Sequence, residues 1–466
     1  MPIPLSETSI QCPSLMTGPL LDFGSPFWNS ENMVQELPVL ASSGFESTGK
    51  YGIGFFSLFM WGSHVRVVSR RYKDAARDTR VLEFVKGLRA RPTLRRAQDS
   101  EYLADGGTSV RIWVASPPES ENGILFRPAH TRRTLEDTCA WLCPAIDANL
   151  VVQRANVRRT VVRASDWKTM NGEELLHRLA DDTLRSAWML QERERLIPLT
   201  ARNLLLLTDK SGAVIGRAAI APTNVYLEIG AITDGGLRAC GLSRVAGLIK
   251  GSATKASRDV ATPIVDAQTL AEWASSQQGL VVEAAVDKPA LAYAADTVVH
   301  CGGIPGALPI ALSSRGWASV EDIRAWKPVP DQVLIVELSD LQNVANDLGP
   351  VELLPNVLAC GDENMYLITG AALLMWPDTG LFHERPFRNR STESLVASLL
   401  AEKWSTTLDE VLAVSTIAGR LNVNWVEVGT VGGKPIRRSA HILRNPHAKP
   451  VPVVSHSPRK RRRRKT

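Results

Sequence analysis

The sequence lacks an apolar stretch long enough to cross a membrane. Its most apolar run, residues 53–61, is about half as long as the ~18-residue segment that a membrane helix requires. The first ten residues, MPIPLSETSI, also lack the basic start and apolar core of a secretory signal. We therefore predict a cytoplasmic protein without a membrane partner.

Cysteine is also scarce, with six residues scattered along a chain of 466. So few cysteines in a chain of this size do not indicate a disulfide framework. Cys139 and Cys143 could share one face of a helix, but the two further ligands that a zinc ion needs do not follow at tight spacing. We interpret the cysteines as reduced thiols and predict no metal site built from them.

The positive charge of the chain gathers in a C-terminal tail. The formal net charge is +6, and the seven residues from Arg459 to Lys465 (RKRRRRK) carry +7, so the rest of the chain sums to about −1. Residues 446–466 are rich in Pro, Ser, His and basic residues, which predicts a disordered tail. Such a basic run can bind nucleic acid without sequence specificity, act as a nuclear import signal, or remain solvated.

The order of the expected elements indicates an α+β protein. We predict three folded regions, residues 1–128, 129–277 and 278–445, before the disordered tail at residues 446–466. The two later regions are mixed α/β. In them we expect strands at residues 203–207, 214–221, 225–229, 333–338 and 422–431, and helices at residues 172–190, 242–248, 267–276 and 392–403.

In the first region, a short helix precedes three segments that alternate between apolar and polar residues. Such alternation is typical of half-buried strands, and the lack of helices between them indicates an antiparallel sheet covered on one face. We expect the helix at residues 55–61 and the strands at residues 64–70, 80–85 and 108–114.

A glycine-rich loop is the most informative segment. Glycines stand at positions 44, 49, 52 and 54, immediately before the expected helix. Glycine lets the backbone reach positive φ, and successive free N–H groups can then form a concave anion site. The helix that follows would add its positive dipole end, so the loop can hold phosphates. The alternative interpretation is a glycine-rich turn before a buried helix.

A P-loop fits this segment poorly, although residues 44–50 read GxxxxGK. The residue after Lys50 should be Ser or Thr to bind magnesium, and here it is Tyr51. Pro38 interrupts the strand that should precede the loop. The glycines also continue past the lysine, where a P-loop is already helical.

Three stretches, in the expected order, resemble the heat-shock protein 90 family of ATPases. They match the family's second glycine box, its strand ending in Ser/Thr-Arg and its Gly-Thr strand, at residues 48–59 (TGKYGIGFFSLF), 65–70 (VRVVSR) and 107–112 (GTSVRI). Residues 20–28 and 40–45 further resemble bacterial members. The resemblance implies the Bergerat fold, a two-layer α/β sandwich, of the gyrase, heat-shock protein 90, histidine kinase and MutL (GHKL) superfamily.

The resemblance also implies a site. The backbone of the glycine box would wrap the β- and γ-phosphates of ATP, Thr108 would help to fix the adenine, and residues 25–44 would be a lid. In the family, an arginine of the following middle domain reaches the γ-phosphate, and Arg258 is the matching residue. The alternative interpretation is that Arg258 is an exposed arginine in a polar loop, without this role. Within the box, we expect ATP to contact Gly49, Lys50, Tyr51, Gly52, Ile53, Gly54 and Phe55.

The match fails upstream of the lid. There the family has a helix whose Glu activates water and whose Asn binds Mg²⁺, and an Asp-x-Gly-x-Gly box whose Asp binds adenine. No Glu–Asn pair of this kind precedes residue 25, and Glu7 stands near the place of the aspartate without the glycines. We therefore expect an N-terminally incomplete domain without a catalytic residue, and weak or absent hydrolysis of the family's substrate, Mg²⁺-bound ATP.

From these features we predict an ATP-binding, chaperone-type protein that acts on an unidentified client or partner, with a homodimer as one arrangement. One alternative is a nucleotide-independent interaction module that uses the C-terminal two thirds of the chain as a binding platform. Another is a nucleic-acid-associated ATPase of the MutL type, which would use the basic tail.

Overall fold

The computed structural model describes most of the chain between residues 31 and 448. The described ranges are 31–36, 38–39, 52–71, 74–121, 123, 125–126, 134–180, 187–223, 227–253, 255, 258, 261–284, 287–361, 391–417, 420–421 and 423–448. These residues divide near residue 270 into two compact units. Both units contain helices and strands, so the predicted α+β class is confirmed at this coarse level.

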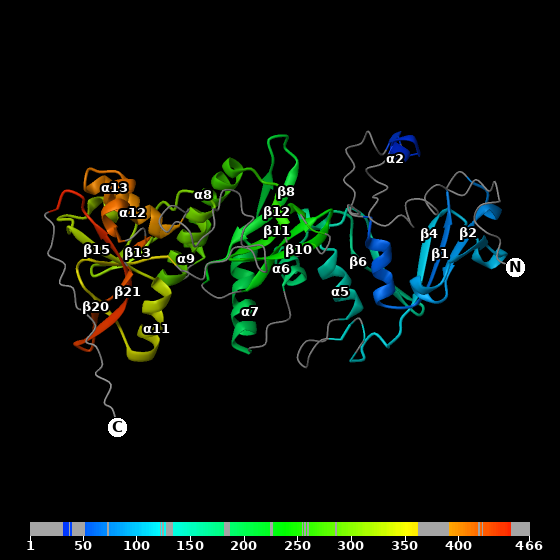
Figure 1. The fold of residues 1–466 in the computed structure, drawn as a ribbon, viewed down its shortest axis with the longest axis horizontal. Helices are drawn as coiled ribbons and strands as arrows, with labels where there is room; N and C mark the ends of the chain where they lie inside the picture. The colour runs from blue at the N-terminus through cyan, green and yellow to red at the C-terminus, as the bar shows by residue number, and fades with distance from the viewer. Residues whose placement is uncertain are drawn as a thin grey trace, which may run out of the picture. The chain divides into compact units, whose positions relative to one another are not determined.

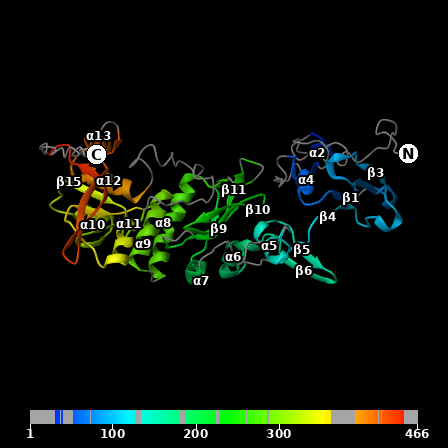
Figure 2. The same ribbon diagram turned by 60° about the horizontal axis from the view of Figure 1, so that its bottom comes forward.

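The first sheet has four antiparallel strands in the order β3-β2-β1-β4 (Figures 1 and 2). Their bounds are β1 His64–Arg70, β2 Arg80–Phe84, β3 Thr93–Arg96 and β4 Gly107–Trp113. The 3₁₀ turns η3 (Ala76–Asp78), η4 (Gly87–Arg89) and η5 (Asp99–Glu101) occur between the strands. The three strands predicted from alternation are confirmed as β1, β2 and β4, whereas the short strand β3 was not expected.

An aromatic helix covers one face of this sheet, as Figure 2 shows. α4 (Gly54–Ser57) continues into the 3₁₀ turn η2 (Leu58–Met60), which together match the predicted helix. The rings of Phe55 and Phe59 lie 5.6 and 5.0 Å, centroid to centroid, from the ring of Phe84. Both rings pack on a buried cluster formed by Val65, Val67, Leu82 and Phe84. Burial of such side chains, each contributing about 1.5–3 kcal/mol, holds the helix against the sheet.

Gly62 lets the chain pass from the helix into β1. A Cβ atom at Gly62 would lie 2.1 Å from the carbonyl oxygen of Trp113, which is backbone and has little room to move.

We expect Gly62→Ala to destabilise the first sheet by about 1–3 kcal/mol, measured by urea unfolding. The control is Gly279→Ala, because a Cβ at this exposed helical position meets no atom within 4 Å. It should instead raise stability by about 0.5–1 kcal/mol. Equal effects of the two variants would contradict the close approach at Gly62.

The rest of the first unit is built on a six-stranded sheet. β10, β9, β11, β8 and β7 follow one another across it, and β12 pairs with β11. The strands are β7 Leu205–Thr208, β8 Val214–Ile220, β9 Glu228–Asp234, β10 Leu237–Ser243, β11 Val245–Ala253 and β12 Ala261–Pro263. Leu175, Leu176 and Leu179 of helix α6 pack on β9 and β11. The other elements are α2 Glu31–Glu36, α5 Leu135–Leu142, β5 Leu150–Arg154, β6 Val157–Val162, η6 Asp166–Lys168, α6 Gly172–Leu179 and α7 Ala187–Ala201.

The helix predicted at residues 242–248 is wrong, because these residues end β10 and begin β11. Arg244 lies between the two strands with a φ of +62°. Leu242, Ala246 and Leu248 are all buried, and so are the residues that alternate with Leu248 on the other face of β11. A strand buried on both faces reads as a continuous apolar run, which periodicity cannot distinguish from a buried helix.

The second unit contains a seven-stranded sheet in the order β14-β13-β17-β15-β21-β20-β16. Helices α9 and α11 cover one face, and Figures 1 and 2 show α12 and α13 on the opposite side. The elements are α8 Ala267–Glu283, α9 Lys288–His300, β13 Ala311–Ser313, β14 Gly316–Ala318, α10 Val320–Ala325, β15 Gln332–Val336, α11 Leu338–Leu348, β16 Glu352–Leu353, β17 Val357–Ala359, α12 Thr392–Lys403, α13 Leu408–Ser415, β18 Thr416–Ile417, β19 Arg420–Leu421, β20 Val423–Val431 and β21 Lys434–Arg444. The predicted helices at residues 267–276 and 392–403 and strands at 333–338 and 422–431 are confirmed. None of the helices in the described ranges combines the length and the apolarity needed to span a bilayer.

Candidate functional site

The described part of the glycine box begins at Gly52. Its φ of +64° is a left-handed conformation that favours glycine. Ile53 is the N-cap of α4, and its carbonyl accepts hydrogen bonds from the N–H groups of Phe56 and Ser57. Among the described residues, the N–H groups of Gly54 and Phe55 have no acceptor, and a Cβ at Gly54 would meet no atom within 4 Å. Free N–H groups at the start of a helix can donate hydrogen bonds to a phosphate.

The first half of the glycine box lies outside the described residues. This holds for Gly49, Lys50 and Tyr51, for Glu7, for the basic tail from Arg459 to Lys465, and for most of the expected lid at residues 25–44. The convergence of the N–H groups along the whole of residues 49–55 on one phosphate therefore stays a prediction.

The sheet brings the other two motifs of the resemblance together. β1 and β4 pair so that Arg70 lies opposite Gly107 and Ser69 lies opposite Thr108. The hydroxyls of Ser69 and Thr108 are hydrogen-bonded at 2.9 Å. Thr108 is exposed on β4, which is one of the two edge strands of the described sheet. A hydroxyl at such a position is free to contact a ligand.

A charged network occupies the opposite face of the same sheet. Arg66 Nη2 lies 2.7 Å from a Glu83 carboxylate oxygen, and Arg95 binds Glu101 through two bonds of 2.6 and 2.7 Å. The bond from His64 is the largest cause that lowers the pKa of Glu83. The bond from Arg95, followed by that from the Gln98 backbone N–H, lowers the pKa of Glu101 to about 2. Alternation along the strands places Arg66, Glu83 and Arg95 on one face, but it does not predict which of them pair with each other.

The network makes the first sheet sensitive to acid. Because the pKa of Glu101 is lower in the folded protein than its ordinary value of 4.5, its ionised form stabilises the sheet above pH 4.5, and this contribution is lost as the pH falls from 4.5 towards about 2. We expect Glu101→Gln to remove part of this acid dependence, measured as the unfolding midpoint at several pH values.

The control is Glu121→Gln, because Glu121 is exposed and has no ion pair with another described residue. This variant should follow the wild-type profile. A Glu101→Gln profile that also follows the wild type would show that the ion pair with Arg95 contributes nothing.

Arg258, the candidate γ-phosphate arginine, lies half-buried between β11 and β12 with a φ of +56°. Its Nη1 donates a long hydrogen bond of 3.4 Å to the carbonyl of Asp234 in β9. Its charge acts to lower the pKa of Cys143, but burial is the larger cause, and the pKa of that thiol is raised. These contacts place Arg258 at the six-stranded sheet, and its role at a γ-phosphate stays a prediction.

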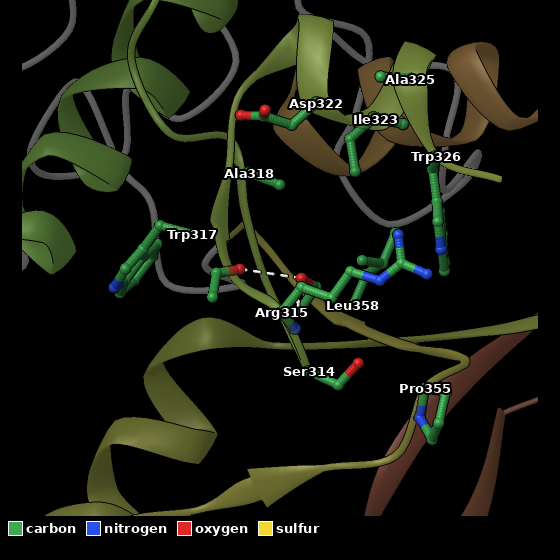
Figure 3. A pocket seen from close by; sticks show the side chains of 12 residues that line it. Ser314, Arg315, Trp317, Ala318, Asp322, Ile323, Ala325, Trp326, Pro355 and Leu358 are labelled. Carbon is green, nitrogen blue, oxygen red and sulfur yellow. Dashed lines mark hydrogen bonds between the residues drawn. The ribbon is translucent and has the colours of Figure 1, made fainter.

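The second unit holds a pocket of about 250 Å³, drawn in Figure 3. The hairpin of β13 and β14 forms one wall, where Ser313 Oγ donates a hydrogen bond of 2.9 Å to the carbonyl of Gly316. Arg315, at the tip of this hairpin, extends towards Trp326. Its guanidinium makes no hydrogen bond or ion pair with another described residue. The sequence by itself does not reveal this pocket, because the hairpin and α10 meet Pro355 and Leu358 only in the folded sheet.

We find neither a metal site among the described residues nor a match to a curated protein. Within the described ranges, no group of three or more His, Cys, Asp and Glu side chains could hold a metal ion. No protein-family model matches the chain, and no curated protein matches its sequence.

Proposed function

We propose that the first unit binds ATP, as a chaperone-type ATPase of the heat-shock protein 90 kind would. The observation that carries the proposal is the start of α4. There Gly52 adopts positive φ, and the N–H groups of Gly54 and Phe55 point to no acceptor among the described residues. These groups would receive phosphate oxygens, and the aromatic packing of Phe55 would keep them in place.

The spacing of the site supports a nucleotide. Phe55 packs on Phe84, which lies opposite Val65 of β1. The pair of Ser69 and Thr108 lies four residues further along β1, about 13 Å away at ~3.3 Å per residue. An extended nucleoside triphosphate can reach from one to the other, with its phosphates at the glycines and its base near Thr108.

The proposal concerns binding more than turnover. The missing Glu–Asn helix motif would leave the attacking water and the Mg²⁺ ion without their usual protein groups, so we propose weak or absent hydrolysis. Binding would then act by ordering the lid, as nucleotides do in switching proteins. Measurement of ATP turnover on the purified chain tests this part; a robust Mg²⁺-dependent rate would contradict it.

Nucleotide binding has a direct thermal test. ATP at a hundredfold excess over its dissociation constant should stabilise the first unit by about 2.7 kcal/mol. Gly52→Ala should abolish most of this shift, because alanine is strained at a φ of +64° and the backbone would have to change conformation there.

The matched control is Gly212→Ala. Gly212 has a φ of +83° and lies in the turn between β7 and β8 with open space around it, so the backbone strain is similar. The control should melt earlier than the wild type and yet keep the full ATP shift. Absence of any ATP shift in the wild-type chain would overturn the proposal.

The pocket in the second unit favours the interaction module as a second candidate function. Arg315 presents a guanidinium beside the indole of Trp326, a combination that suits a carboxylate next to an apolar group, as in an acidic peptide segment. Peptides of this kind should bind the wild-type chain in calorimetric titrations, and Arg315→Ser should weaken binding by roughly tenfold. Gly52→Ala should bind them normally. If no acidic peptide binds, or if Arg315→Ser binds equally well, this candidate fails.

A further inference from the structure

A polar row crosses the helix-covered face of the first sheet, beyond its apolar half. Register places Arg96 opposite Arg80, Arg80 opposite Ser69, and Ser69 opposite Thr108. These four residues alternate in phase with the apolar residues on which α4 packs, so they share that face. The apolar residues of the same phase include Val65, Val67, Leu82, Phe84, Leu94 and Ile112.

Arg80 is the unusual member of this row. It is only 7% exposed, and its Nε and Nη1 atoms are buried without a hydrogen-bond partner. No ion pair joins its guanidinium to another described residue. A buried, unpaired guanidinium is strongly unfavourable, since it loses its hydration and receives no acceptor in return.

The neighbours of Arg80 increase the need for an anion. Arg96 lies directly opposite on β3, and like charges in this position repel each other. Two carboxylates of the same sheet region, Glu83 and Glu101, are bound to Arg66 and Arg95 on the other face. One face of the sheet therefore holds paired charges, and the other holds two arginines whose side chains have no ion pair with a described residue.

We propose that the row of Arg96, Arg80, Ser69 and Thr108 is a second anion subsite, which takes a phosphate group. A phosphate dianion matches two guanidinium groups in charge and accepts several hydrogen bonds at once. The Ser69–Thr108 pair adds a donor, because the hydroxyl that accepts within the pair still has its own hydrogen to give. Arg96 and Thr108 are exposed and give access from the two edges of the sheet.

The subsite lies apart from the glycine box, where the proposed function places the phosphates of ATP, but it includes Thr108, beside which that proposal places the base. A phosphate at the subsite and ATP in that orientation would therefore compete for Thr108. The phosphate could be a free inorganic ion or part of a larger phosphorylated ligand, including ATP bound in another orientation. The inference stands on the unpaired arginines alone and does not require that ATP binds at Gly52.

The test uses the full chain and three variants. Arg80→Met replaces the guanidinium with an apolar side chain, Arg80→Lys keeps the charge without the planar fork, and Arg111→Met is the control. Arg111 lies on the opposite face of β4, 5.9 Å from the ring centroid of Trp113. Melting temperature and binding are measured with inorganic phosphate, with chloride at equal ionic strength, with ATP and with adenosine.

We expect phosphate, and not chloride, to raise the melting temperature of the wild type and of Arg111→Met. Arg80→Met should bind phosphate at least roughly tenfold more weakly than the wild type. The phosphate affinity of Arg80→Lys should lie between those of the wild type and of Arg80→Met. Without phosphate, Arg80→Met should melt above the wild type, because the buried unpaired charge is gone. A merely structural arginine would give the opposite order of melting temperatures.

The two proposals fail separately. If ATP does not bind but the phosphate shift still depends on Arg80, the subsite stands and the nucleotide proposal fails. If Arg80→Met also weakens ATP but leaves adenosine unchanged, the phosphate comes from the nucleotide. If Arg80→Met and Arg111→Met respond equally to phosphate, or if Arg80→Met melts below the wild type without phosphate, the subsite is overturned.

Discussion

The N-terminal region depends on one contact, the packing of the aromatic helix on the β1–β2 pair. Phe55 and Phe59 meet Phe84 over Val65 and Val67, and this packing orients the helix start that follows the glycines. A four-residue helix has almost no stability of its own, because nucleation costs more than a single turn returns. Tertiary packing is therefore what places the free N–H groups beside the sheet.

The same contact explains why the two faces of the sheet differ so strongly. Alternation along β1 and β2 sends the valines, Leu82 and Phe84 towards the helix and sends Arg66 and Glu83 to the other side. On the outer face, arginines and glutamates satisfy one another, as the low pKa of Glu101 reflects. On the face that the helix covers, the row of apolar residues is followed by Arg80 and Ser69. There the proposed phosphate would supply the hydrogen-bond acceptor that the Arg80 guanidinium lacks.

Alternation predicted the strands that bury one face, whereas apolar runs buried on both faces could be either strand or helix: β15 was predicted correctly and the junction of β10 and β11 was not. β1, β2 and β4 followed from their alternation, and α12 matched its prediction to the residue. Residues 242–248 were assigned to a helix, because the end of β10 and the start of β11 carry apolar residues on both faces. The sequence contained a hint that Arg80 is buried, since Arg80 alternates in phase with Leu82 and Phe84. Alternation alone, however, does not reveal whether an arginine at the start of a strand reaches solvent.

By itself, the sequence determined the α+β character, the glycine box with its following helix, the alternation of the first strands and the basic tail, because these depend on residue type and on spacing along the chain. Only the tertiary structure decided which residues meet. Register brought Ser69 to Thr108 and Arg80 to Arg96, and folding brought Arg315 to Trp326. Such pairings are not encoded in local spacing. They depend on strand register and on loop geometry, which are fixed only when the chain folds.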